Sequence, residues 1–120
     1  MGLDQYAGVM PQDDTDFTAT FVWRKHSKLQ AWAEALFKEK TGQGAEHLNC
    51  GTLPLDIEDI ETLRSLIVKS GLPTSEGGFL YGHQFQDEAA AQYAEQDLEF
   101  CDWAKEALSN GKTIVYSCWW

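Results

Sequence analysis

The chain has 120 residues, 43% of them hydrophobic, and its 19 acidic residues against nine Lys and Arg residues give a formal net charge of -10. This length and apolar content exclude a disordered chain and favour one folded domain. The excess of carboxylates excludes general nucleic-acid binding, because that affinity depends on cations that neutralise phosphates.

The sequence predicts neither a membrane span nor a signal peptide. Its apolar runs are only a few residues long, whereas a span needs about 20, and the start MGLDQYAGVM lacks a basic segment followed by an apolar one. The three cysteines, Cys50, Cys101 and Cys118, are widely spaced and form no CxxC pair. They indicate free thiols in a reducing cytoplasm rather than a disulfide framework.

The first part of the chain has the pattern of two strands and a helix. Residues 3–10 (LDQYAGVM) form a predicted strand, and residues 11–16 (PQDDTD) form an acidic loop. Residues 17–23 (FTATFVW) alternate large and small side chains, which is typical of a second strand. A helix is predicted to follow, beginning with a capping box between Ser27 and Gln30. Its inner face would consist of Leu29, Trp32, Ala33, Leu36 and Phe37.

The middle of the chain predicts a third strand and a second helix. Residues 48–55 (LNCGTLPL) form a short strand that is interrupted at Gly51. Asp56 is the predicted cap of the second helix. Apolar residues then recur at helical spacing, namely Ile57, Ile60, Leu63, Leu66 and Ile67. Residues 72–85 (LPTSEGGFLYGHQF) are rich in turn formers and predict a loop with a short apolar strand.

The last third predicts a long helix and a closing strand. The helix would begin at a cap formed by Asp87 and end near Asn110, a length of about 34 Å. Its inner stripe would consist of Tyr93, Ala94, Leu98, Cys101, Ala104 and Leu108. Residues 112–120 (KTIVYSCWW) form the closing strand. These elements do not alternate strictly, so we expect an α+β fold, a single compact domain over residues 1–120 with three helices on a small, mainly antiparallel sheet of three to four strands.

Basic and aromatic residues gather where the second strand meets the first helix. A helix N-terminus favours anions, so cations at this place need another explanation. One interpretation makes Arg24 and Lys25 the ligands of a small anion such as a nucleotide. The aromatic walls of that pocket would be Trp23, Trp32 and Tyr81.

Two of the candidate residues also have a structural interpretation. Arg24 would form an internal ion pair with Asp97, because a carboxylate on the inner stripe of a helix seldom stays unpaired. Cys50 could be a nucleophile with one of the three histidines as its base, but a lone Cys beside apolar residues is more often a packed core residue. The spacing of the His and Cys residues predicts no metal site, and no cofactor is expected.

The third predicted helix carries the chain's main concentration of acid. Its carboxylates are Asp87, Glu88, Glu95, Asp97, Glu99, Asp102 and Glu106. Such a run is usually a solvated face, but a row of carboxylates also imitates the charge of a nucleic-acid backbone and would bind a protein that normally holds DNA or RNA. The candidate partner-binding residues are Glu95, Glu99, Asp102, Glu106, Trp119 and Trp120, the last two because terminal tryptophans expose an apolar patch unless the sheet covers them.

Several short motifs together resemble a family of small, mostly uncharacterised proteins encoded by bacteriophages. The matching pieces are MGLDQY at the start, WRK followed by Trp32, NCG, GGFLYG, and the Asp-Leu pair at residues 97–98. Ser27 and Gln30 stand where that family tends to have Asn and His. The resemblance implies an accessory protein that acts in the host cytoplasm, and it implies no particular reaction.

The preferred hypothesis is therefore a phage-type accessory protein that binds and modulates a host cytoplasmic protein through its acidic helix and aromatic surface. The alternative is a protein that sequesters a small anionic ligand, such as a nucleotide, in the Trp/Arg/Lys pocket. Catalysis ranks third, because the sequence contains no recognisable set of nucleophile, base and oxyanion donors.

Overall fold

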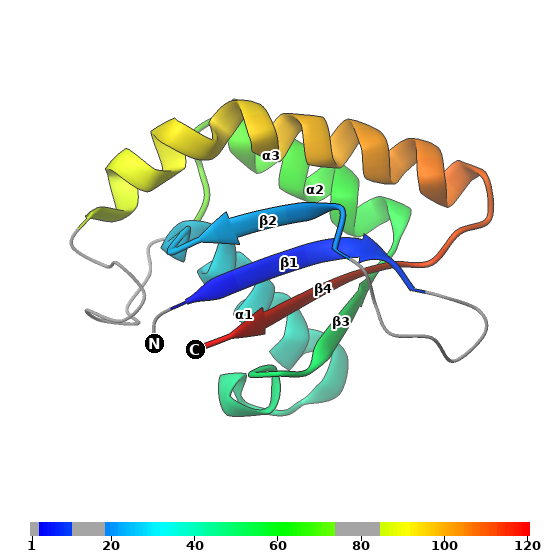
Figure 1. The fold of residues 1–120 in the computed structure, drawn as a ribbon, viewed down its shortest axis with the longest axis horizontal. Helices are drawn as coiled ribbons and strands as arrows, with labels where there is room; N and C mark the ends of the chain where they lie inside the picture. The colour runs from blue at the N-terminus through cyan, green and yellow to red at the C-terminus, as the bar shows by residue number, and fades with distance from the viewer. Residues whose placement is uncertain (1–2, 11–18, 74–84) are drawn as a thin grey trace.

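The protein consists of a four-stranded antiparallel sheet packed against three helices. The computed structural model describes residues 3–10, 19–73 and 85–120. The strands are β1 (Asp4–Val9), β2 (Phe21–Arg24), β3 (Thr52–Leu55) and β4 (Ile114–Trp119). The helices are α1 (Ser27–Thr41), α2 (Ile57–Val68) and α3 (Gln86–Ser109), and a short 3-10 helix, η1 (Ala45–His47), follows α1. The α+β class and the single globule are as predicted (Figure 1).

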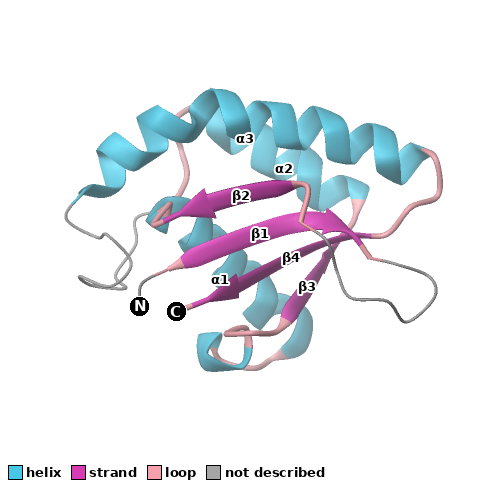
Figure 2. Ribbon diagram, viewed as in Figure 1, coloured by secondary structure: helices cyan, strands magenta, loops and turns pink. Residues whose placement is uncertain are grey.

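The first and last strands form the centre of the sheet, whose order is β2-β1-β4-β3 (Figure 2). Asp4 pairs with Trp119 and Val9 pairs with Ile114, so β1 and β4 match along their whole length. All neighbouring strands are antiparallel. Consequently the ends of the chain contribute the most enclosed strands, and the short strands β2 and β3 occupy the edges.

One face of the sheet, here called the inner face, packs against the helices. Because side chains alternate along a strand, it holds every second residue. Its buried apolar residues are Ala7, Trp23, Leu53, Leu55, Ile114, Tyr116 and Cys118. The helices cover them with Leu29, Trp32, Ala33, Phe37, Ile60, Leu63, Phe100, Cys101, Ala104 and Ala107. The inner face predicted for α1 is therefore confirmed in its main members, and in α2 Ile60 and Leu63 are buried as predicted. In α3 only Cys101 and Ala104 of the predicted stripe are buried, whereas the buried Phe100 and Ala107 were not predicted.

Two predicted helix caps are wrong. Ser27 is the first residue of α1, which begins after His26 without a side-chain cap. The Ser27 hydroxyl is buried and has no hydrogen-bond partner among the described residues. Gln30 is also buried and points into the core, so it cannot complete a capping box. At α3 the residue before the helix is Phe85, and Asp87 lies within the first turn.

The predicted cap of α2 is confirmed. The Asp56 carboxylate accepts a hydrogen bond from the Asp59 backbone N–H at 2.9 Å, and the Asp59 carboxylate accepts one from the Asp56 N–H at 2.9 Å. This reciprocal capping box satisfies two donors that a helix start leaves unpaired. The hydrogen bond from the Asp59 N–H lowers the pKa of the Asp56 carboxyl.

We expect Asp56→Ala to lower the free energy of unfolding by about 1 kcal/mol at pH 7. The pKa of Asp56 is lower in the folded than in the unfolded protein, so the ionised carboxylate stabilises the fold. Its contribution to the free energy of unfolding is complete above the unfolded pKa of about 3.9. It is lost as the pH falls through the folded value. Urea unfolding at pH 7 and at acid pH measures both effects, and Asp56→Asn, a neutral cap, is the control. An equal loss of unfolding free energy in Asp56→Ala at pH 7 and at acid pH would contradict the assignment of Asp56 as an ionised cap.

Helix side chains hydrogen-bond to both edges of the sheet. At the β2 edge, Gln96 Nε2 of α3 donates to the backbone oxygen of Val22 at 2.8 Å. At the β3 edge, Lys40 Nζ of α1 donates to the backbone oxygen of Pro54 at 2.8 Å, and proline has no N–H to offer. These contacts reduce the number of backbone groups that another strand could pair with.

Candidate functional site

The described residues do not form the predicted Trp/Arg/Lys pocket. Trp23 and Trp32 are buried in the core, with 1% and 7% of their surface exposed. Arg24 lies on the opposite, outer face of the sheet, where its guanidinium is 3.7 Å from the Asp4 carboxylate. Lys25 is half-buried in the turn between β2 and α1 and has a positive φ of 54°. The remaining candidate, Tyr81, lies outside the described residues.

The predicted ion pair between Arg24 and Asp97 is also wrong. Asp97 does point inward from α3 and is only 1% exposed. Its two oxygens, however, contact Trp23 Nε1 at 2.8 Å and His26 Nε2 at 2.7 Å. Strand alternation places Trp23 inside and Arg24 outside, so the neighbouring residue supplies the partner. His26, considered from the sequence only as a possible base for Cys50, is brought to Asp97 by the turn before α1.

A buried polar network extends from Asp97 across the sheet. The Gln5 side chain accepts from the His26 backbone N–H at 2.9 Å and donates to the His26 backbone oxygen at 3.0 Å. Gln5 also donates to the Tyr116 hydroxyl at 2.9 Å, and that hydroxyl donates to Gln30 Oε1. All five residues are at most 1% exposed. The network joins β1, β4, α1 and α3 and fixes the turn that contains His26.

His26 resembles the histidine of a catalytic dyad in its contacts but not in its accessibility. Its Nε2 bonds to the Asp97 carboxylate, and its ring stacks on Tyr93 with centroids 5.2 Å apart. Its Nδ1 has no hydrogen-bond partner among the described residues. A general base must reach the proton that it removes, whereas this ring is 0% exposed. The His26–Asp97 pair therefore holds the β2–α1 turn against α3 and fixes the orientation of the Asp97 carboxylate.

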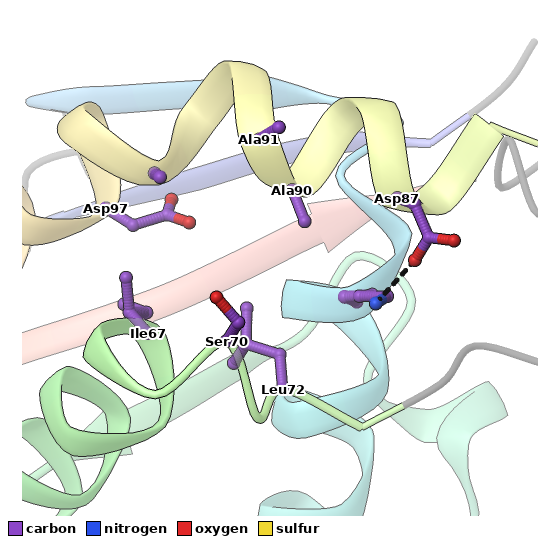
Figure 3. A pocket seen from close by; sticks show the side chains of 9 residues that line it. Ile67, Ser70, Leu72, Asp87, Ala90, Ala91 and Asp97 are labelled. Atoms are coloured by element: carbon purple, nitrogen blue, oxygen red, sulfur yellow. Dashed lines mark ion pairs between the residues drawn. The ribbon is translucent and has the colours of Figure 1, made fainter.

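A pocket of about 220 Å³ lies beside this network, where α1 begins, α2 ends and α3 begins (Figure 3). Its lining consists of Lys28, Ile67, Ser70, Leu72, Asp87, Ala90, Ala91, Ala94 and Asp97. Asp87 lies at one end of the pocket and Asp97 at the other (Figure 3). The Lys28 ammonium lies 2.7 Å from the Asp87 carboxylate. Sequence reasoning missed this pocket, because its walls are the ends of three helices that are distant along the chain.

Five exposed carboxylates of α3 form a single row, here called the acidic stripe. Its members are Glu88, Glu95, Glu99, Asp102 and Glu106. Their spacing of seven, four, three and four residues keeps them on one face of a helix, over a length of about 27 Å. Asp97 faces the core, and Asp87 lies about 100° around the helix from Glu88, so neither belongs to the stripe.

The acidic stripe is only partly neutralised. Asp102 accepts a hydrogen bond from Arg64 Nε of α2 at 3.0 Å. Within the described part of the chain, the other four carboxylates form no ion pair. Lys105, which lies on the same helix, is instead 3.7 Å from Glu61. The stripe therefore retains most of its negative charge.

The two terminal tryptophans have different environments. Trp119 lies on the outer face of the sheet, opposite Asp4, and is 62% exposed. Trp120 packs against the core, and its backbone N–H donates to the Asn49 side chain at 3.0 Å. Trp119 and the acidic stripe lie on different layers of the fold, the sheet and the helices. The predicted acidic and aromatic surface is thus divided into two parts.

The cysteines are all free, and their packing differs from the expectation for Cys50. Cys50 is exposed, with a positive φ of 63°, so its prediction as a core residue is wrong. Its thiol contacts the Asn49 side chain and, among the described residues, bonds to no histidine. Burial raises the pKa of Cys101 and of Cys118 to about 12, which keeps both thiols protonated and unreactive.

Within residues 3–10, 19–73 and 85–120, no cluster of His, Cys, Asp and Glu side chains could hold a metal ion. None of the helices described has the length and apolar character needed to cross a bilayer. Comparison with protein-family models, curated proteins and solved structures gives no match to this chain.

Proposed function

We propose that the protein binds a basic protein partner through the acidic stripe of α3, and that it is a phage-type accessory protein which modulates a host cytoplasmic protein in this way. The observation that carries the proposal is the row of five exposed carboxylates on one helix face, four of them without an ion pair to a described residue. The like charges in such a row repel one another, and a bound cationic partner reduces this repulsion.

The dimensions of the stripe favour a partner that normally binds nucleic acid. Its length of about 27 Å corresponds to the axial rise of about eight base pairs. The formal net charge of -10 adds a long-range negative field to that of the stripe. Such a field steers a basic partner to the surface and weakens as salt is added.

Trp119 is the aromatic residue of the proposed surface, because Trp120 packs against the core. This residue lies on the outer face of the sheet together with Val22, which is 54% exposed. A partner that covered the acidic stripe alone would leave Trp119 in solvent. The acidic stripe is therefore the surface to test first. The alternative, sequestration of a small anion, lacks comparable support because its predicted ligands are dispersed.

Charge reversal in the stripe is expected to abolish partner capture. We expect the variant with Glu95→Lys and Glu99→Lys to lose a partner that the unchanged protein captures from host lysate, with affinity reduced at least about 100-fold, or about 2.7 kcal/mol. Pull-down with mass spectrometry identifies the partner, and calorimetry at two salt concentrations measures its affinity.

The matched control carries Glu39→Lys and Glu46→Lys, at two exposed acids outside α3 that give the same change in net charge. It should retain the partner with little change in affinity. Equal loss in both variants would mean that net charge alone is responsible. Retention of the partner by the α3 variant would refute the acidic stripe as the binding surface.

A further inference from the structure

We propose that the pocket between the ends of α1, α2 and α3 binds a small primary amine, held as the ammonium ion by Asp97 with an apolar body against the alanines of α3. This site is independent of the acidic stripe, which lies on the exposed face of the same helix. The pocket has a charged inner end, apolar walls and a mouth that contains an ion pair.

The inner end of the pocket is a carboxylate with unused acceptor capacity. Each oxygen of Asp97 receives one hydrogen bond, from Trp23 or from His26. A carboxylate offers about four acceptor positions, and these two hydrogen bonds use about half of them. Asp97 lines the pocket although it is only 1% exposed, and Figure 3 shows its carboxyl group pointing from α3 toward the space that Ala90 and Ser70 border. A cationic donor is the group that best matches a buried carboxylate.

The walls of the pocket suit a short aliphatic or aromatic body. Ala90, Ala91 and Ala94 leave space along α3 that larger side chains would fill. Ile67, near the end of α2, and Leu72, in the segment that follows it, form the facing wall (Figure 3). A volume of about 220 Å³ is below the usual range for drug-sized ligands, so the occupant must be small.

The charges around the pocket exclude an anion as the preferred ligand. At the mouth, the Lys28 ammonium is already paired with the Asp87 carboxylate at 2.7 Å. Asp97 then adds a second carboxylate, so among the described residues the lining carries two negative groups against one positive group. A ligand carboxylate would be repelled by both, whereas an ammonium ion would be attracted to the inner end.

The test compares three probes of equal chain length: n-butylammonium, butan-1-ol and butyrate. In NMR titrations followed through backbone amides, we expect n-butylammonium to shift Ser70, Ala90 and Ala94. Its dissociation constant should be at least about tenfold lower than that of butan-1-ol, because the hydroxyl can donate only a neutral hydrogen bond to the carboxylate, whereas the ammonium ion adds the attraction between opposite charges. Equal affinities for all three probes, tighter binding of butyrate, or no shift with n-butylammonium would overturn the proposal.

Two variants locate the binding. Ala94→Leu adds three carbon atoms inside the pocket and should weaken n-butylammonium binding at least about tenfold, whereas the same substitution at exposed Ala35, outside the pocket, should leave it unchanged. Asp97→Asn keeps the shape of the side chain and should remove the preference for n-butylammonium over butan-1-ol. If Asp97→Asn does not fold, the Ala94→Leu result decides alone. Undiminished binding in Ala94→Leu would refute the site.

Discussion

Replacing Asp97 with Ala is expected to lower the free energy of unfolding by about 3 to 5 kcal/mol, which is a large share of the about 5 to 15 kcal/mol typical of a domain. The substitution removes the acceptor of the Trp23 indole N–H and the partner of the His26 ring. Both donors lie in the core and cannot turn to water. Each would therefore keep its desolvation penalty without a compensating hydrogen bond.

Urea unfolding followed by tryptophan fluorescence and by circular dichroism measures this loss. Asp102→Ala is the matched control, because Asp102 lies on the same helix and forms an exposed pair with Arg64. We expect it to change stability by less than about 1 kcal/mol. Asp97→Asn, which can still accept from Trp23 and donate to His26, should fall between the two. Equal stabilities for Asp97→Ala and Asp102→Ala would show that the network contributes nothing.

Truncation of Phe100 to Ala is expected to cost about 3 to 5 kcal/mol of stability as well, for a different reason. Phe100 is 1% exposed, and its ring meets those of Trp23 and Phe21 edge-on, with centroids 5.4 Å away in each case. Trp103 closes the cluster at 6.3 Å. Removal of the ring leaves a cavity between α3 and β2 that the surrounding rings cannot fill without leaving their packed positions.

The control for this prediction is the same substitution at Phe85, immediately before α3, where the side chain is 60% exposed. Phe85→Ala should alter the free energy of unfolding by no more than about 0.5 kcal/mol. Near-ultraviolet circular dichroism adds a second readout, because the Phe21, Trp23 and Trp103 rings lose their common neighbour only in Phe100→Ala. A loss below about 1 kcal/mol for Phe100→Ala would mean that the cluster collapses freely around the gap.

Asp97 and Phe100 share a partner, so the stability of the variant that carries both substitutions shows how the two sites are coupled. Trp23 contacts Asp97 through its indole N–H and Phe100 through its ring. Substitutions that share a partner are seldom additive. The double variant is therefore expected to lose less than the sum of the single losses, because Trp23 is already released by the first change.

Much of the fold could be predicted because it depends on local pattern. The spacing of apolar residues in α1 and α2 gave their inner faces, and Asp56 gave the start of α2. Strand alternation in β4 gave Ile114, Tyr116 and Cys118 as one buried face. These features follow from helix and strand periodicity, which each segment carries within itself.

The candidate sites were predicted less well, because their residues are brought together by the packing of distant elements. The inward position of Asp97 followed from its place on the helix, but its partners come from β2 and from the turn before α1. Ser27 was predicted as a cap from its neighbours alone. The structure instead buries it at the base of α1, where local preference yields to the burial of the turn.

The acidic character, the α+β class and the row of carboxylates on α3 follow from composition and helical spacing, which are properties of the chain. The pairing of Arg24 with Asp4 on the outer face, the bonds from Asp97 to Trp23 and His26, and the pocket where three helix ends meet follow only from the packed fold. Long-range contacts of this kind depend on strand order and helix packing, which no local pattern contains.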